Sequence, residues 1–168
     1  MGKGGTVNTA WISAGSNLGD RRAQLQRGLA ALEACGRIIG VSSCYETEPV
    51  GNREQAWFLN LALGLETRLA PRPLLAFCQR VELAQGRVRP FPNAPRTLDL
   101  DILFYGDLVI VEPDLVLPHP RLQDRRFVME PLAEIAPLLE HPVLHRSVRQ
   151  LLELCPDRSE VRKITAGG

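Results

Sequence analysis

The segment FLNLALGLET (residues 58–67) has the most regular strand pattern in the chain. Leucine occupies every second position, and successive side chains of a β-strand point to opposite faces, so the leucines share one face. That face consists of Leu59, Leu61, Leu63 and Leu65, and the opposite face of Phe58, Asn60, Ala62 and Gly64. The pattern predicts a strand whose leucine face packs against helices and whose mixed face is left for another purpose.

Further strands and helices are predicted on both sides of this segment. We expect strands at residues 7–15, 37–47 and 96–107, and helices between Asp20 and Gly36 and over residues 70–87. The resulting order is β-α-β-β-α-β. It predicts an α+β, ferredoxin-like fold, in which an antiparallel sheet is covered by helices on one face. Helical patterns near residues 127–139 and 148–154 are expected to be C-terminal additions.

Length and composition indicate an ordinary globular protein with one domain. The 168 residues are 45% hydrophobic and 23% charged, and we expect residues 1–168 to form a single domain. A net charge of +1 does not favour nucleic acid or an acidic membrane as a partner. No apolar run is long enough to span a bilayer, and the four cysteines are scattered. These features predict a cytoplasmic protein with reduced thiols.

The segment RTLDLDILFYGD (residues 96–107) places two aspartates in a predicted strand. Asp99 and Asp101 lie at alternate positions, so their carboxylates project from one face with Cα atoms about 6.5 Å apart. Aspartate is uncommon in strands, and two like charges at this distance repel each other. A divalent cation removes the repulsion, and carboxylate oxygens suit Mg²⁺. The alternative is a solvent-exposed strand face that carries incidental charges.

Arginine supplies nearly all of the positive charge. All but two of the 20 basic residues are arginines, and the lysines, Lys3 and Lys163, lie near the two ends. A phosphate-binding Walker lysine inside the fold is therefore excluded. Several arginines flank the aspartate pair, namely Arg87, Arg89, Arg96, Arg125 and Arg126. Carboxylates ringed by arginine suit a polyphosphate with its metal, although an arginine-rich surface alone explains part of this pattern.

Two smaller features point to ligand contacts. Phe58 and Asn60 share the mixed strand face, where a flat heterocycle could stack on the ring and form hydrogen bonds with the amide. A second small core against a loop is the alternative. His119 lies between two prolines in LPHPR, so its backbone is stiff. It could donate to a phosphate, or it could be a histidine in a surface turn.

The chain resembles the family of 6-hydroxymethyl-7,8-dihydropterin pyrophosphokinases, which act in folate biosynthesis. The resemblance is strongest in APRTLDLDILFYGD (residues 94–107), which is similar to the family signature. Supporting segments are ISAGSNLGDR, YETEPVGNREQAWFLNLALGLET, QRVELAQGRVR and LPHPRLQDRRFVMEPLAEIAP. The resemblance implies a ferredoxin-like, monomeric enzyme that moves pyrophosphate from ATP to the hydroxymethyl group of a reduced pterin and releases AMP.

The resemblance also implies roles for individual residues. Two Mg²⁺ ions would be held by Asp99 and Asp101. The pterin pocket would consist of Thr47, Pro49, Val50, Phe58, Asn60 and Phe127. The ATP side would consist of Gln79, Glu82, Arg87, Arg89, Arg96, Ile102, His119 and Arg125. Arg87, Arg89 and Arg96 would stabilise developing charge, and Asp101 could assist the attacking hydroxyl. Many members carry a Trp in the loop that reads RPFPNAPR here.

Two other functions are compatible with parts of the pattern. A metal-dependent phosphohydrolase could use the same carboxylate pair, and AMP release that does not depend on a pterin would favour it. Ferredoxin-like folds also form RNA-binding modules with aromatic residues on the open sheet face. The two aspartates and the near-neutral charge argue against this module, because they would not attract a phosphodiester backbone.

Overall fold

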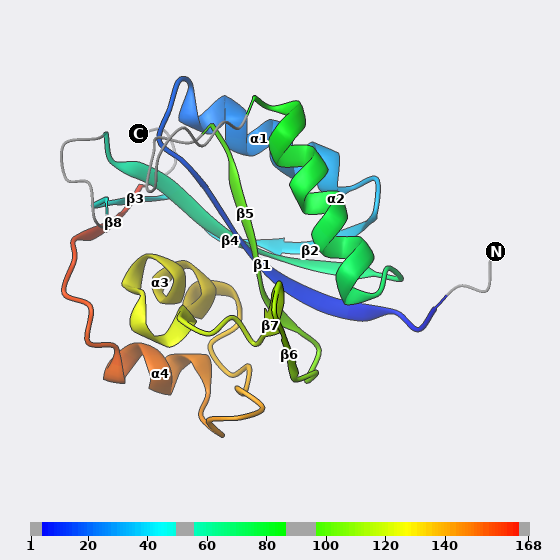
Figure 1. The fold of residues 1–168 in the computed structure, drawn as a ribbon. Helices are drawn as coiled ribbons and strands as arrows, with labels where there is room; N and C mark the ends of the chain where they lie inside the picture. Colours follow the sequence, from blue (N-terminus) through cyan, green and yellow to red (C-terminus); the bar gives the residue numbers. More distant parts are fainter. Residues whose placement is uncertain (1–4, 50–55, 87–96, 165–168) are drawn as a thin grey trace.

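The computed structural model describes residues 5–49, 56–86 and 97–164, which form a mixed α/β structure (Figure 1). The helices and strands are, in chain order, β1 (Asn8–Ser16), α1 (Arg21–Leu32), β2 (Gly36–Val41), β3 (Tyr45–Thr47), β4 (Phe58–Thr67), α2 (Pro71–Ala84), β5 (Asp99–Tyr105), β6 (Ile110–Glu112), β7 (Leu115–Leu117), a 3-10 turn η1 (Leu122–Asp124), α3 (Arg126–Ile135), α4 (Val148–Leu154) and β8 (Val161–Lys163). None of the described helices is long and apolar enough to cross a membrane.

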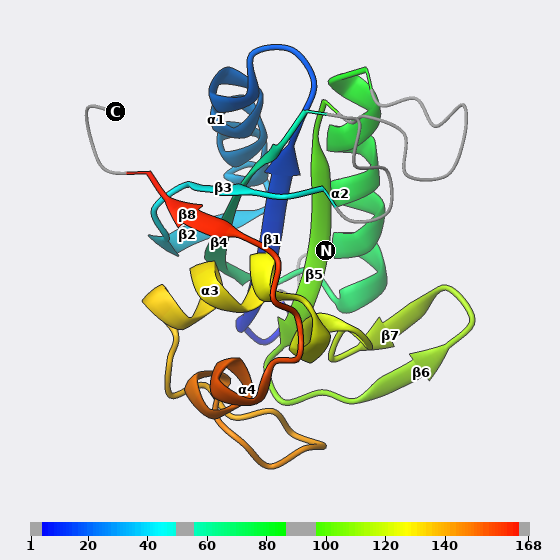
Figure 2. The same cartoon turned by 90° about the vertical axis from the view of Figure 1, so that its left-hand side faces the viewer.

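The main sheet is antiparallel, as the sequence predicts. Its strand order is β5-β1-β4-β3-β8, and β2 pairs with the remaining length of β4. The central pair runs from Asn8 opposite Thr67 to Ser16 opposite Leu59. Strands β6 and β7 form a separate hairpin, which extends from the body of the molecule in Figure 2. Arg72 at the start of α2 forms ion pairs with Asp114 and Glu112 of this hairpin.

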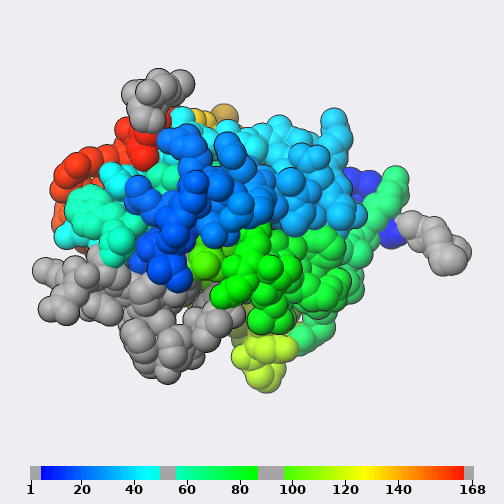
Figure 3. All heavy atoms as spheres, turned by 90° about the horizontal axis from the view of Figure 1, so that it is seen from above, coloured from blue at the N-terminus to red at the C-terminus, as the bar shows by residue number. Residues whose placement is uncertain are grey.

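Helices α1 and α2 cover one face of the sheet and lie side by side (Figure 3). Asp20 begins α1 by accepting a 3.1 Å hydrogen bond from the backbone N–H of Ala23, and Pro71 stands at the start of α2. The leucine face of β4 lies under these helices, and all four of its leucines are buried in the larger core cluster. This part of the prediction is confirmed.

The expectation of helices on one face only is wrong for the sheet as a whole. Helix α3 contacts β4 from the other side, and α4 packs on α3. The apolar side of α3, which includes Val128, Met129 and Leu132, is buried against Ala62 and the strand β5 residues Leu103 and Phe104. A helix with such an apolar side gains stability by burying it, and Ala62 leaves room for this contact. Among the described residues, the mixed face of β4 is therefore covered by a helix at one end only.

A β-bulge in β5 divides its side chains between the two faces. The pairing with β1 runs from Ile12 opposite Ile102 to Trp11 opposite Phe104, so Leu103 is an extra residue. Before the bulge, Leu98, Leu100 and Ile102 belong to the core cluster under α1 and α2. Asp99 and Asp101 alternate with these buried residues and therefore project from the opposite face, at its open end.

Candidate active site

A pocket of about 460 Å³ occupies the open end of the sheet face that α3 covers elsewhere. Eight of the predicted site residues line it, namely Thr47, Phe58, Asn60, Asp99, Asp101, His119, Arg125 and Phe127. Strands β1, β3, β4 and β5 form its floor. The segment that leads from β7 into the first turn of α3 forms a wall. Lining residues as far apart in the chain as Ser13 and Phe127 thus meet because the sheet and α3 bring their elements together.

The floor contains a row of three residues on neighbouring strands. Gly15 of β1 lies opposite Asn60 of β4 on one side and opposite Asp99 of β5 on the other. Since neighbouring strands are about 4.8 Å apart, the Cα atoms of Asn60 and Asp99 are separated by about 10 Å across the sheet. The polar amide with its neighbouring ring, Phe58, is therefore held on one side of Gly15. The carboxylate pair is held on the other side.

Gly15 allows this row to form. A Cβ atom at this position would lie 2.3 Å from Oδ1 of Asn60 and 3.5 Å from Cδ1 of Phe58. The first distance is far shorter than any ordinary contact, so a side chain here would displace the Asn60 amide. The backbone of β1 thus provides a flat floor, and the amide oxygen of Asn60 lies directly above it.

Thr47 orients the Asn60 amide. Nδ2 of Asn60 donates a 2.6 Å hydrogen bond to Oγ1 of Thr47, and the two residues are only 4% and 1% exposed. This hydrogen bond distinguishes the two ends of the amide. The amide nitrogen points to β3 and the amide oxygen lies over Gly15. Such a fixed amide can read the donor pattern on the edge of a flat ligand.

Asp99 and Asp101 form the acidic side of the pocket. Both line it from the same face of β5, and Asp101 lies opposite Ser13 of β1, a further lining residue. Two carboxylates that converge on one space are oxygen donors of the kind that Mg²⁺ binds, so this donor set fits the cation. Within the described ranges, no group of three or more His, Cys, Asp or Glu side chains gathers. Water and substrate phosphate would therefore complete the coordination.

His119, Arg121 and Arg125 form the basic side of the pocket. Burial lowers the pKa of His119 to about 4, and the positive charges of Arg125 and Arg121 add to this effect, while Asp99 opposes it. His119 is therefore neutral at pH 7. Its Nδ1 accepts a 3.3 Å hydrogen bond from the backbone N–H of Arg121, so the ring proton is on Nε2. The histidine can donate from Nε2 without adding charge.

Phe127 forms the apolar part of the wall. It stands in the first turn of α3 and lines the same pocket as Phe58 of the floor. The guanidinium carbon of Arg125 lies 5.7 Å from the centre of the Phe127 ring, which is within cation–π range. A pocket with aromatic rings on floor and wall, an oriented amide, two carboxylates and several cations suits a flat polar ring together with a polyphosphate.

Four other predicted site residues are described by the structure and do not line this pocket. Gln79 is exposed on α2, Ile102 is buried in the core, and Pro49 is buried outside the pocket lining. Glu82 of α2 is also buried, and its Oε2 accepts a 2.7 Å hydrogen bond from the backbone N–H of Leu100. The remaining four predictions, Val50, Arg87, Arg89 and Arg96, fall outside the described residues, as does the loop RPFPNAPR.

Several lining residues were not predicted from the sequence. Ser13 and Gly15 enter the site only through the register of β1 with its neighbours, which a local pattern does not reveal. Glu48 and Arg121 also line the pocket. Arg121 follows His119 by two positions, and this spacing together with the shared segment LPHPR was the available signal.

Comparison with known families assigns this site to a class of enzymes. Residues 11–137 match the family described as 7,8-dihydro-6-hydroxymethylpterin-pyrophosphokinase (HPPK). The match covers well over half of the chain, so the chain belongs to this family. Its relatives are named as pyrophosphokinases of a dihydropteridine, which are transferases of folate biosynthesis that use ATP.

Relatives of similar length support this assignment. The 2-amino-4-hydroxy-6-hydroxymethyldihydropteridine pyrophosphokinase of Pseudomonas aeruginosa is 42% identical over 152 residues, which are 89% of this chain and 93% of that protein. The enzyme of the same name from Bacillus subtilis is 45% identical over 135 residues, which are 79% of this chain and 81% of that protein.

Longer proteins match over one part of their length. Folic acid synthesis protein fol1 of Schizosaccharomyces pombe is 40% identical over 151 residues, but this chain spans only 21% of its length. Among solved structures, the A437G form of Plasmodium falciparum HPPK-DHPS with pteroate has a TM-score of 0.74 at 19% identity. The alignment covers 91% of this chain and 44% of that one, and it shows the similarity of the fold alone.

Proposed function

We propose that the chain transfers the pyrophosphoryl group of ATP to the hydroxymethyl oxygen of 6-hydroxymethyl-7,8-dihydropterin and releases AMP. The observation that carries the proposal is the row Asn60, Gly15 and Asp99, which holds a ring-reading amide and a carboxylate about 10 Å apart on one rigid sheet. Family membership supports the same reaction.

The pterin ring would lie beside the Asn60 amide, which occupies the space over Gly15. Phe58 and Phe127 would contact its two faces, and the Asn60 amide, oriented by Thr47, would bind its polar edge. Pro49 and Val50 would complete this side. In this pose the hydroxymethyl group points across β1 toward Asp99 and Asp101.

The triphosphate would lie on the acidic and basic side. Asp99 and Asp101 would hold two Mg²⁺ ions, which neutralise phosphate charge and make the hydroxyl more acidic when bound. His119 would donate from Nε2, and Arg121 and Arg125 would pair with phosphate oxygens. Arg87, Arg89 and Arg96 remain proposed ligands of the phosphates. Gln79 and Ile102 would lie near the nucleotide.

The chemical step would be a direct in-line displacement. The hydroxymethyl oxygen forms a bond to the β-phosphorus, and the bond from that phosphorus to the α–β bridging oxygen breaks, so that AMP departs with the electron pair. The hydroxyl proton passes to water or to Asp101. The arginines stabilise the charge on the transferred group, and the chain itself forms no covalent bond.

Three further features belong to this proposal. The residues 1–168 would act as a single ferredoxin-like domain, and the strand order β5-β1-β4 with β2 beside β4 supports that topology. The protein would be monomeric. It would act in the cytoplasm, and its four cysteines, which are all free thiols, are compatible with that compartment.

The test is an assay of AMP release with Mg-ATP, run with and without the reduced pterin. We expect AMP to form only when the pterin is present, in equal amount to the pyrophosphorylated pterin. AMP formation at the same rate without the pterin would overturn the proposal and favour a phosphohydrolase.

A further inference from the structure

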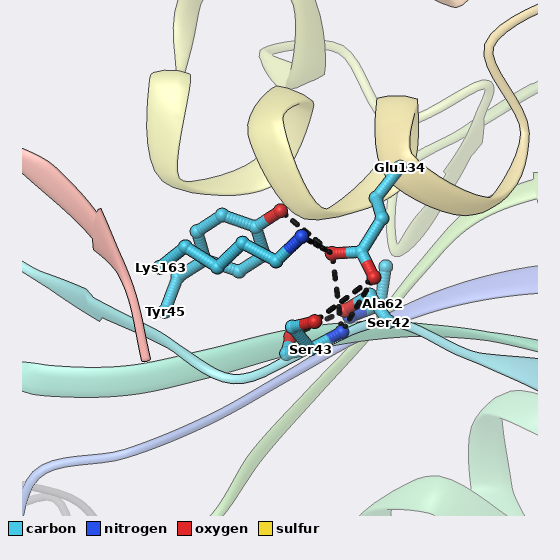
Figure 4. A network of polar contacts seen from close by, with 6 residues as sticks. All are labelled: Ser42, Ser43, Tyr45, Ala62, Glu134 and Lys163. Atoms are coloured by element: carbon cyan, nitrogen blue, oxygen red, sulfur yellow. Dashed lines mark hydrogen bonds and ion pairs between the residues drawn. The ribbon is translucent and has the colours of Figure 1, made fainter. Parts of the chain in front are cut away.

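A polar cluster at the far end of α3 joins this helix to the sheet (Figure 4). The carboxylate of Glu134 accepts a 2.6 Å hydrogen bond from the Tyr45 hydroxyl. It also accepts from the backbone N–H of Ser43 at 3.0 Å and from the Ser43 hydroxyl at 3.0 Å. Lys163 of β8 lies opposite Tyr45, and its Nζ is 4.0 Å from Oε1 of Glu134. We call Glu134, Tyr45, Ser43 and Lys163 the α3 clamp.

The charge states of the α3 clamp favour these contacts. Burial raises the pKa of Tyr45, and the bond to Glu134 raises it further, so the hydroxyl keeps its proton and donates. Burial opposes the ionisation of Glu134, but hydrogen bonds from Tyr45 and Ser43 outweigh it and lower the pKa of the carboxyl group. A charged acceptor thus meets three donors, which is the stronger class of hydrogen bond.

The α3 clamp and the pocket share the same two elements. On α3, Phe127 and Glu134 are seven residues apart, so they lie on one side of the helix about 10 Å apart. On β3, Tyr45 and Thr47 lie at alternate positions and share one face. Helix α3 and strand β3 therefore approach each other at two points along their lengths. The contact between Glu134 and Tyr45 is at one level, and the pocket between Phe127 and Thr47 is at the next.

The neighbouring bonds make the strand side of the α3 clamp rigid. The Ser42 hydroxyl accepts a 2.9 Å hydrogen bond from the backbone N–H of Ala62 and donates to the Ser43 carbonyl at 2.7 Å. This holds the turn between β2 and β3 on β4. At the other end of α3, the backbone N–H of Arg126 donates to Asp157 at 3.0 Å. The helix is thus held at both ends, and the α3 clamp is its direct polar link to the sheet strand that carries Thr47.

We propose that the α3 clamp sets the width of the pterin slot, by holding α3 at the distance from β3 and β4 at which a flat ring contacts both Phe127 and the floor residue Phe58. Tyr45 and Glu134 are then positioning residues, which touch no substrate. The inference rests on the proposed function. Aromatic rings stack with centroids about 4.5 to 7 Å apart, so a small outward shift of α3 weakens the contact with Phe127. On the nucleotide side, Asp99 and Asp101 lie on β5 and only Arg125 adjoins α3, so this side is affected less.

Tyr45→Phe tests this inference, because it removes one hydroxyl and keeps the ring. The matched control is Tyr105→Phe. Tyr105 is also buried, and its hydroxyl also donates a 2.6 Å hydrogen bond, to the Leu69 carbonyl, but in the core under α1 and α2. Titration calorimetry would give dissociation constants for 6-hydroxymethyl-7,8-dihydropterin and for α,β-methylene-ATP with Mg²⁺. The methylene group replaces the bridging oxygen of the bond that the reaction breaks.

We expect Tyr45→Phe to raise the dissociation constant of the pterin about tenfold and that of the nucleotide less than about twofold. Tyr105→Phe should leave the ratio of the two constants unchanged, even if it lowers the melting temperature as much as Tyr45→Phe does. Glu134→Gln, which keeps an acceptor, should give a smaller shift in the same direction. Equal effects of both tyrosine variants on both ligands would overturn the inference while leaving the proposed function intact. Wild-type protein that binds the nucleotide but not the pterin would overturn both.

Discussion

The carboxylate of Glu82 on α2 accepts a 2.7 Å hydrogen bond from the backbone N–H of Leu100 on β5. Leu100 stands between Asp99 and Asp101, and β5 is an edge strand of the sheet. An edge strand leaves backbone N–H groups without a strand partner, and Glu82 supplies one at this position. The helix therefore fixes the backbone that carries both carboxylates of the candidate site.

Removal of the Glu82 carboxylate is expected to affect stability and activity together. Glu82→Ala leaves the Leu100 N–H buried without its acceptor, which costs about 1–3 kcal/mol in the free energy of unfolding. Glu82→Gln keeps an oxygen acceptor and should cost distinctly less. Urea unfolding measures the stability, and AMP release measures the activity. If the two variants lost equal stability, the bond to Leu100 would not be the reason for the buried glutamate.

The carboxylates of Asp99 and Asp101 are expected to matter for turnover far more than for folding. Asp99→Asn and Asp101→Asn should each lower kcat by at least about 100-fold, because a neutral amide holds Mg²⁺ poorly. The matched control is Asp107→Asn, an exposed aspartate at the end of the same signature segment, which should retain turnover. Normal turnover in either pocket variant at saturating Mg-ATP would contradict the proposed metal role.

Gly15 should tolerate no side chain. In Gly15→Ala the new Cβ would meet Oδ1 of Asn60 at 2.3 Å, so the amide must move away from its place over the floor. We expect the KM of the pterin to rise at least about tenfold and the KM of ATP to change little. Gly40→Ala on β2 is the control, since no atom lies within 4 Å of its added Cβ. Equal kinetic constants for the two variants would contradict the proposal that the Asn60 amide binds the polar edge of the pterin ring.

Acid is expected to destabilise the protein partly through His119. Because burial lowers the pKa of His119 from 6.5 to about 4, the unfolded chain takes up this proton more readily than the folded one. Stability therefore falls as the pH decreases from 6.5 to about 4, with a slope from this residue of at most about 1.4 kcal/mol per pH unit. His119→Gln should flatten the dependence of the unfolding free energy on pH in that window. Parallel curves for wild type and variant would show that the histidine is not buried as described.

The strands and helices that the sequence predicted best were those with a strong local period. Alternate leucines identify β4, and the stripe of Leu74, Cys78 and Val81 identifies α2. The predicted single strand at residues 37–47 is instead two, β2 and β3. The break occurs at Ser42, whose backbone N–H donates to the Ala62 carbonyl at 2.8 Å while its side-chain hydroxyl, in place of a backbone carbonyl, accepts from the Ala62 N–H. Strand β8 was missed, because its three residues gain their structure only by pairing with β3.

The candidate site divides in the same way. Asp99, Asp101, Phe58 and Asn60 could be selected because the period of two places them on sheet faces that a core does not require. Gly15 could not, because its role depends on which residues stand opposite it on two other strands. Glu134 could not either, since its carboxylate meets donors about 90 residues earlier in the chain.

The row of Asn60, Gly15 and Asp99 has a consequence for inhibitor design. The two halves of the site are mounted on β4 and β5 of one sheet, with β1 between them, so the separation of their Cα atoms is a property of the backbone. A single compound that joins a bicyclic head to an anionic tail would need a tether matched to two strand spacings, about 10 Å. A compound with a shorter or longer tether is expected to bind in one half of the site and to lose its contacts in the other.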